Sequence, residues 1–236
     1  MNAVVTALIG PLLASVAQAA PLEGLERYAA GARPEQQLPL VVVLHGYGAR
    51  PDDIVGLVTG LPVPARLWAP RAPTAAGPGW SWFPPSRAPR FGDVVADIAA
   101  ARDLVAASIA DEMRSHPTCG QPVVVGFSQG AVLSWALAAL PKPIVGLALP
   151  VSGALPEALR PAKRPASAPR VRAFHGDADP RVALDDDRST AIIFERAGFD
   201  ASLKSYSGVG HTIVTSEADD IRSAITEALR RSGCAR

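Results

Sequence analysis

The chain alternates between short, unbroken apolar runs and longer segments in which apolar residues recur every three or four positions. Unbroken runs are typical of strands buried on both faces of a sheet, whereas the longer spacing is typical of amphipathic helices. Buried strands are predicted at 38–46, 66–73, 122–127, 144–153 and 170–177, a short edge strand at 25–30 and an alternating strand at 201–208. The helices are predicted at 94–113, 130–140, 185–198 and 216–231.

Strands and helices follow one another in turn, which predicts an α/β fold with a mostly parallel central sheet and helices on both faces. Ser216 and Asp219 have the spacing of a capping box at the start of the last helix. The longest predicted loop, 74–92, is too short for a separate lid domain, which indicates an open cleft. We expect a single domain over 21–236, with active residues in loops at the carboxyl ends of strands.

Composition narrows the class of protein. A chain of 236 residues is long enough to bury a sizeable core. The net charge is +1 and no long basic run occurs, so no nucleic-acid partner is expected.

The first 20 residues carry no charged side chain. Residues 3–17 are apolar but too short to span a bilayer comfortably, and Ala-Gln-Ala at 17–19 is similar to a signal-peptide cleavage site. This pattern predicts a signal peptide and a periplasmic or secreted protein with no stable membrane anchor. Because no Lys or Arg precedes the apolar stretch, an N-terminal extension of a cytoplasmic protein is the alternative.

The chain has two cysteines, Cys119 and Cys234, without the spacing of a metal site. Each follows a predicted helix, so both are expected at the N-terminal edge of the sheet. A disulfide between them would suit an exported protein, but the sequence does not establish the distance and leaves the bond open.

One candidate for chemistry is Gly-Phe-Ser-Gln-Gly at 126–130, between an apolar strand and a helix. A sharp strand-to-helix turn exposes the hydroxyl of Ser128, and a Cβ at Gly126 or Gly130 would crowd that turn. The motif alone is equally compatible with an ordinary turn serine. A second candidate is the turn at 45–48, where the N–H of Tyr47 and the N–H of Gln129 would form an oxyanion hole.

Two more strand ends supply a base and a carboxylate. His211 lies in a glycine-flanked loop after the last predicted strand, which suits a catalytic base. Asp177 and Asp179 both follow the strand at 170–177, and either carboxylate can orient a histidine, with a slight preference for Asp179 deeper in the turn. The order Ser128, Asp179, His211 is the chain order of α/β-hydrolases.

The chain resembles the acyl-protein thioesterase / phospholipase–carboxylesterase family of the α/β-hydrolase fold. The resemblance runs from about Leu38 to the C-terminal helix and rests on LHGYGARPDD, GWSWFP, GFSQGA, HGDADPRV and GVGH. It implies that Asp179 is the triad carboxylate, and that Trp82 and Phe83 line the acyl-binding side of the cleft. The alternative for these aromatic residues is that they close the core beneath a proline-rich loop.

The sequence departs from the family pattern in three places. The first two dozen residues look added, which favours an export leader. Tyr47 stands where a smaller aliphatic residue is common, and Ala131 stands where a third glycine is often seen. These two changes bear on the shape of the cleft and therefore on the choice of substrate.

The sequence thus predicts a serine carboxylic-ester hydrolase that acts through an acyl-enzyme on small esters, thioesters or lysophospholipids. No metal or organic cofactor is expected, and the protein is expected to be a monomer or a homodimer. A secreted polymer or cell-wall esterase is the alternative within enzymes. A catalytically inactive binding protein on the same fold is the alternative from another class.

Overall fold

The computed structural model describes residues 20–234, so the predicted signal peptide lies outside the described residues except for its last position. The strands are β1 (Gly24–Ala29), β2 (Leu40–Leu44), β3 (Ala65–Pro70), β4 (Thr74–Ala76), β5 (Gly79–Ser81), β6 (Val123–Phe127), β7 (Leu147–Val151), β8 (Arg170–Gly176) and β9 (Ala201–Tyr206). The helices are α1 (Pro51–Val55), α2 (Val95–Ser115), α3 (Gln129–Ala138), α4 (Leu184–Arg196) and α5 (Thr215–Arg231), with 3-10 turns η1 (Pro89–Phe91) and η2 (Glu157–Leu159).

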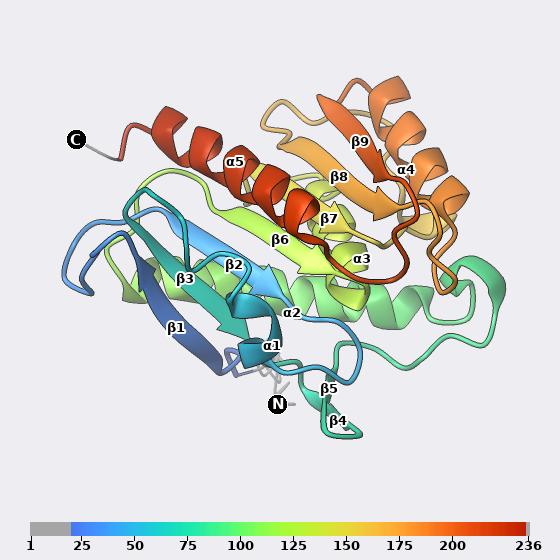
Figure 1. Ribbon diagram of the computed structural model, residues 1–236, viewed down its shortest axis with the longest axis horizontal. Coiled ribbons are helices and arrows are strands. Elements are labelled where there is room, and N and C mark those ends of the chain that lie inside the picture. The colour runs from blue at the N-terminus through green and yellow to red at the C-terminus, as the bar shows by residue number, and fades with distance from the viewer. Residues whose placement is uncertain (1–19, 235–236) are drawn as a thin grey trace, which may run out of the picture.

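The main sheet has seven strands in the order β1-β3-β2-β6-β7-β8-β9. All neighbouring pairs are parallel except β1 and β3, which confirms the predicted mostly parallel sheet. Figure 1 shows α1 and α5 on one face of this sheet and α2 and α3 on the other. The parallel order brings the carboxyl ends of β2, β6, β8 and β9 to one edge. The domain boundary at residue 21 stays a prediction.

The apolar runs form strands because both of their faces are covered. Leu40, Val42 and Leu44 of β2 pack into a cluster with residues of α2, α3 and α4. Val41 and Val43 point the other way and pack with residues of α1 and α5. Side chains alternate between the faces of a strand, so a strand buried on both sides reads as an unbroken apolar run.

A short helix and a short hairpin were not predicted. Residues 51–55 form α1, which is too short to show a helical stripe in the sequence, although Pro51 at its start suits a helix N-terminus. The segment 74–92 is not a plain loop, because β4 and β5 pair as an antiparallel hairpin within it.

The capping box predicted at Ser216 and Asp219 is wrong. Helix α5 begins at Thr215 with Val214 as its N-cap, and no side chain caps it. Asp219 instead pairs with Arg222 one turn further on, at 2.5 Å. The helix starts earlier than the sequence pattern indicated, which places Glu217 in its first turn.

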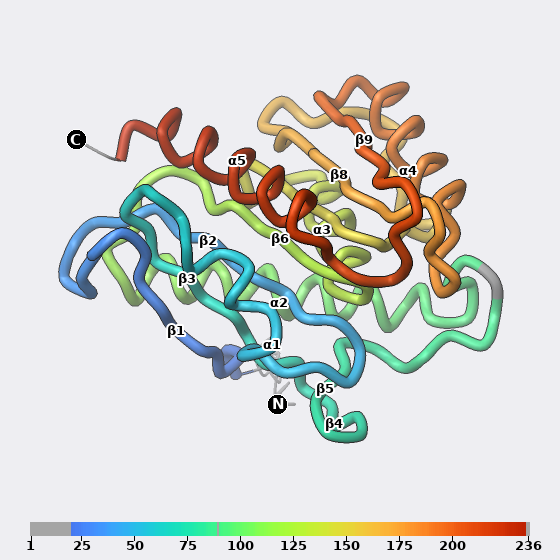
Figure 2. Tube along the Cα trace, viewed as in Figure 1, coloured from blue at the N-terminus to red at the C-terminus, as the bar shows by residue number. Residues whose placement is uncertain are grey.

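Cys119 and Cys234 form a disulfide with their Cα atoms 5.8 Å apart. The N–H of Cys119 donates to the carbonyl of Leu38, just before β2, so the bond lies at the expected N-terminal edge of the sheet. Figure 2 shows the last turn of α5 on the side of the molecule where β2 and β6 begin. Among residues 20–234 no helix combines the length and the apolar character needed to cross a membrane.

Candidate active site

Ser128 lies in the sharp turn between β6 and α3. Its φ of 56° and ψ of −114° are values that residues other than glycine rarely adopt. A Cβ at Gly126 would lie 2.1 Å from the carbonyl oxygen of Gly130, and a Cβ at Gly130 would lie 2.1 Å from that of Leu44. The backbone therefore approaches its neighbours so closely that only glycine fits at both positions. The turn places Ser128 at the carboxyl edge of the sheet.

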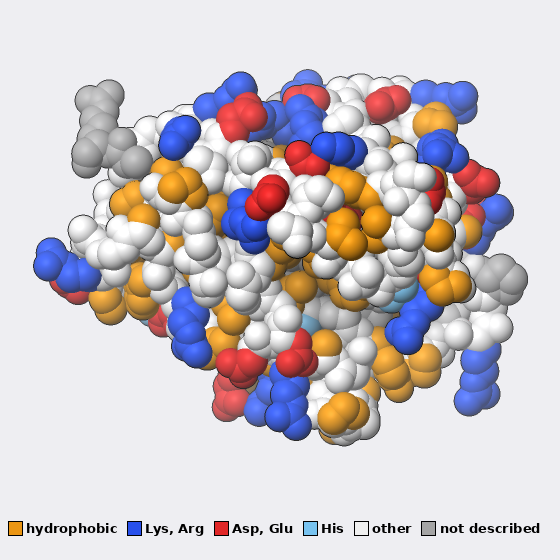
Figure 3. All heavy atoms as spheres, in the orientation of Figure 1, with side chains coloured by type: hydrophobic (Ala, Val, Ile, Leu, Met, Phe, Trp, Pro, Cys, Tyr) orange, Lys and Arg blue, Asp and Glu red, His pale blue; other side chains and the backbone are white. Residues whose placement is uncertain are grey.

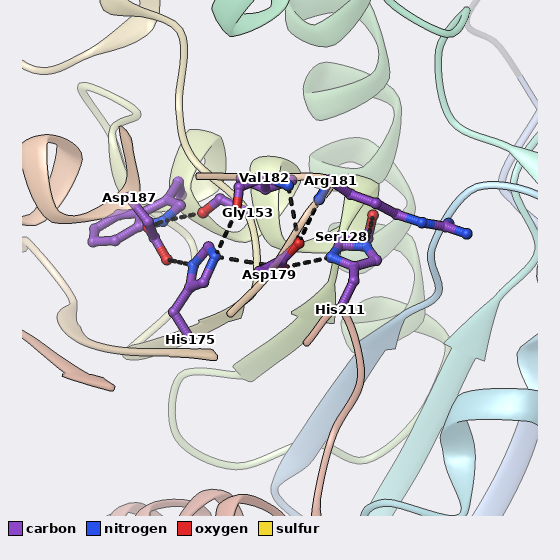
Figure 4. A network of polar contacts seen from close by, with 9 residues as sticks. Ser128, Gly153, His175, Asp179, Arg181, Val182, Asp187 and His211 are labelled. Atoms are coloured by element: carbon purple, nitrogen blue, oxygen red, sulfur yellow. Dashed lines mark hydrogen bonds and ion pairs between the residues drawn. The ribbon is translucent and has the colours of Figure 1, made fainter. Parts of the chain in front are cut away.

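His211 and Asp179 are hydrogen-bonded in series with Ser128 (Figure 4). His211 Nε2 lies 3.0 Å from Ser128 Oγ, and His211 Nδ1 lies 2.6 Å from Asp179 Oδ2. The side chain of Asp179 is fully buried and that of His211 is 7% exposed. Since the carboxylate is an acceptor, Nδ1 carries the proton and Nε2 is left to accept from the serine hydroxyl.

The pKa of Asp179 lies below its ordinary value. Burial alone would raise it, but the hydrogen bond from His211 and those from two backbone N–H groups outweigh burial and hold the carboxylate ionised. Asp177 is exposed, and its Oδ1 accepts from the N–H of Gly208 at 2.6 Å. The structure thus brings Asp179 to the imidazole, while Asp177 holds the backbone of the loop that carries His211.

A second histidine–aspartate pair lies behind Asp179 (Figure 4). His175 Nδ1 lies 2.8 Å from Asp187 Oδ2, and His175 Nε2 lies 3.0 Å from the carbonyl oxygen of Val182. Burial lowers the pKa of His175, but its hydrogen bond to Asp187 and the charge of that carboxylate outweigh burial and raise the pKa. His175 therefore fixes the Val182 backbone, which in turn donates to Asp179.

The N–H groups of Tyr47 and Gln129 both border the Ser128 turn. Gln129 is the first residue of α3, so its N–H has no acceptor within the helix. In the described part of the chain neither N–H donates to a protein acceptor. A Cβ on Gly46 would lie 3.3 Å from Ser128 Cβ, so the Tyr47 turn packs directly against the serine.

The side chain of Gln129 makes hydrogen bonds to the aromatic loop that the sequence did not predict. Its Oε1 accepts from the N–H of Trp82 at 3.0 Å, and its Nε2 donates to the carbonyl of Phe83 at 2.8 Å. These bonds join the aromatic loop to the start of α3. They therefore fix the position of the Gln129 N–H beside Ser128.

Trp82 and Phe83 are buried and do not stand exposed on a cleft wall, while the prediction that they line the acyl-binding side of the cleft stays a prediction. Each is 3% exposed and belongs to the cluster that packs beneath α2. The Trp82 Nε1–H donates to the carbonyl of His45 at 2.8 Å, which satisfies its one polar group inside the protein. In this structure both side chains bury their large apolar surface in the core, as the alternative interpretation expects.

Glu217, in the first turn of α5, is a buried carboxyl group outside the triad. Within residues 20–234 its two carboxyl oxygens have no hydrogen-bond partner. Burial raises its pKa to about 7, against the lowering effects of the nearby Val214 backbone N–H, which does not form a full hydrogen bond with it, and of the His175 charge, while Asp220 acts to raise it. Glu217 is therefore uncharged in the folded protein at acidic pH.

Glu217→Gln is expected to stabilise the protein in alkaline but not in acidic solution. The pKa of Glu217 is about 7 when folded and near the ordinary 4.5 when unfolded, so the stability that the glutamic acid contributes is lost as pH rises through about 7. Above about pH 7 the buried carboxyl is ionised. There the free energy of unfolding of the unchanged protein should be about 3 kcal/mol lower than that of the Glu217→Gln variant. Urea unfolding at about pH 5 and about pH 9 measures this.

The matched control is Glu195→Gln, which changes an exposed glutamate on α4. In this variant the free energy of unfolding should differ between the two pH values by as much as it does in the unchanged protein. If Glu217→Gln raised the free energy of unfolding by the same amount at both pH values, the raised pKa of Glu217 would be contradicted.

A parallel sheet with a serine turn after β6, and with an aspartate and a histidine in later strand-end loops, is the architecture of an α/β-hydrolase. The sequence profile of the phospholipase/carboxylesterase family matches residues 26–229. The chain belongs to this family.

Individual relatives agree with this assignment. Acyl-protein thioesterase 1 of Gibberella zeae is 32% identical over 114 residues, which cover 45% of this chain and 48% of that protein. The match thus spans about half the length of that relative. The crystal structure of esterase PE8 is 26% identical with a TM-score of 0.74, over 88% of this chain and 99% of that one. Zea mays acyl-protein thioesterase 2, at 24% identity and a TM-score of 0.68, covers 88% of this chain and 100% of its own and shares the fold.

Proposed function

We propose that the protein is a serine carboxylic-ester hydrolase that acts through an acyl-enzyme. The observation that carries this proposal is the hydrogen-bonded series from Ser128 Oγ through His211 to Asp179. The strained turn and the two unpaired N–H groups beside it supply the other two parts that acyl transfer needs, an exposed nucleophile and an anion-binding position.

In the first half-reaction His211 Nε2 takes the proton of Ser128 as Oγ attacks the acyl carbonyl carbon. The buried Asp179 carboxylate accepts from Nδ1–H and stabilises the imidazolium that forms. The N–H groups of Tyr47 and Gln129 donate to the carbonyl oxygen as it becomes an oxyanion, each worth about 3–4 kcal/mol in comparable sites. His211 then protonates the departing alcohol or thiol, and the acyl group stays on Ser128.

In the second half-reaction water replaces the leaving group. His211 accepts a proton from the water as its oxygen attacks the acyl-serine carbonyl, and the same N–H groups hold the second oxyanion. Return of the proton to Ser128 Oγ releases the carboxylic acid. The His175–Asp187 pair keeps the Asp179 loop in place throughout, through the Val182 backbone.

Small esters, thioesters and lysophospholipids are the proposed substrates. The family description names phospholipase and carboxylesterase, and the Gibberella zeae relative is named a thioesterase. Export to the periplasm or the medium is the proposed location. The disulfide supports it, because such bonds persist mainly in oxidising compartments.

Labelling with a fluorophosphonate probe tests the proposal. The phosphonate reacts with an activated serine, so the protein is expected to be labelled on Ser128 and to lose ester hydrolysis as it is labelled. Ser205→Ala, which changes an exposed serine on β9, is the matched control and should label as the unchanged protein does. No labelling, together with no hydrolysis of esters or thioesters, would instead support an inactive binding protein.

A further inference from the structure

A cavity of about 240 Å³ opens beside the triad, between the loop at 86–91, the segment at 154–160 and the start of α4. Its wall includes Arg181 and Val182, whose N–H groups donate to Asp179 Oδ1 at 2.8 and 3.0 Å. Another wall begins at Ala154, directly after Gly153, where a Cβ would lie 2.7 Å from the carbonyl oxygen of Ser128. The triad side chains do not line the cavity, but two of its wall residues bind the Asp179 carboxylate through their backbone, and a third follows a glycine that packs against the backbone of Ser128.

The cavity is lined by three guanidinium groups and one carboxylate. Arg90 pairs with that carboxylate, Asp186, at 2.7 Å. Arg160 donates to the carbonyl of Leu155 at 2.8 Å and to Ser189 Oγ at 3.2 Å, so its two hydrogen-bond partners are neutral. Burial lowers the pKa of Arg160, which shows that its charge is held in a partly desolvated place.

Arg90 and Arg181 are both exposed cations of this cavity, but only Arg90 is paired with a carboxylate in the described residues. In the described part of the chain no carboxylate lies within 4.0 Å of the guanidinium of Arg181 or of that of Arg160. In Figure 4 the Arg181 side chain extends away from the Asp179 contacts, on the side of the network where Ser128 is drawn. On the face shown in Figure 3, histidine atoms are visible in a hollow with a basic side chain beside them.

Arg160 and Arg181 thus make no direct ion pair among the described residues, although the charges of Glu157 and Asp186 act on Arg160 from further away. Phe91, Leu155 and Val182 add apolar surface to the same cavity. A planar guanidinium binds a carboxylate or a phosphate through paired hydrogen bonds, and partial exclusion of water strengthens that attraction.

We propose that this cavity binds an anionic group of the substrate, a carboxylate or a phosphate, and that Arg181 contacts it. The inference rests on the proposed ester hydrolysis and makes Arg181 a specificity-determining residue. The protein would prefer esters that carry a negative charge near the scissile bond over neutral esters of the same size.

Two pairs of esters test this, each with one charged and one neutral member. In the first pair the charge is on the acyl side: the 4-nitrophenyl monoester of glutaric acid and its methyl ester. In the second pair the charge is on the alcohol side: 4-(butyryloxy)benzoate and its neutral counterpart, methyl 4-(butyryloxy)benzoate. In one pair, Arg181→Gln is expected to lower the charged-to-neutral ratio of kcat/KM at least about 10-fold. Arg181→Lys should restore part of that ratio, since it keeps the charge but loses the fork of donors.

Arg188→Gln is the matched control, because Arg188 is an exposed α4 arginine paired with Asp185 that does not line the cavity. It should leave the ratio in both pairs as in the unchanged protein. About 0.5 M NaCl should reduce the preference of the unchanged protein for the charged ester. An Arg181→Gln variant with an unaltered ratio in both pairs would overturn the inference while leaving ester hydrolysis standing. Failure to hydrolyse any of the four esters would count against the proposed function itself.

Discussion

Replacing Ser128 with alanine is expected to lower kcat for p-nitrophenyl butyrate about a millionfold. The Oγ atom is the attacking nucleophile of the proposed mechanism, and no neighbouring hydroxyl is hydrogen-bonded to His211 in the described structure. Alanine must adopt the same positive φ as serine, so the strain in the turn is unchanged and the unfolding free energy should be too. Steady-state kinetics and urea unfolding of the same preparation measure both quantities.

Three companion variants show whether the residues act as one unit. His211→Ala should cost about as much as Ser128→Ala, and the double variant should cost no more than either, because each removes the same attack step. Asp179→Asn should lower kcat about 10⁴-fold, since the amide no longer holds the imidazole in the required tautomer. A Ser128→Ala protein with more than about a tenth of the original kcat would show that the serine is not the nucleophile.

Asp177→Asn is the matched control for the carboxylate. It stands two positions from Asp179 in the same turn, and an asparagine Oδ1 can still accept from the N–H of Gly208. Its kcat should stay within a few-fold of the original. A large loss at Asp177 with little loss at Asp179 would reverse the assignment.

The sequence predicted the sheet and the three triad residues for a shared physical reason. Parallel strands buried on both faces appear as unbroken apolar runs, and their carboxyl ends meet at one edge, so chemistry-bearing residues after separate runs are predicted to be neighbours. Ser128, Asp179 and His211 do meet in the structure, within hydrogen-bonding distance. Their chemical roles stay a proposal.

Features that depend on which way a side chain turns were not predictable. Three aspartates open α4 in succession, and only the phase of the helix against the sheet decides that Asp187 is the one buried against His175. The same holds for Trp82 and Phe83, whose loop position suited either a cleft wall or the core. The side-chain bonds of Gln129 to that loop likewise depend on distances that no spacing in the sequence encodes.

Removing the disulfide with Cys119→Ser and Cys234→Ser together is expected to lower the free energy of unfolding by about 2–4 kcal/mol. The bond closes a loop with a sequence separation of 115 residues, for which the loss of chain entropy in the unfolded state would give a limit of about 5 kcal/mol. Urea unfolding with and without a reductant measures the effect.

The double variant and the reduced original protein should unfold at the same urea concentration, and reductant should not affect the variant. Activity offers an independent control, because the bond lies at the N-terminal edge of the sheet and the triad lies at the carboxyl edge. The folded variant should therefore keep its kcat/KM to within about twofold, since sites this far apart rarely couple. Equal stability of the variant and the oxidised protein would remove the physical reason to place this protein in an oxidising compartment, and with it the main structural support for export.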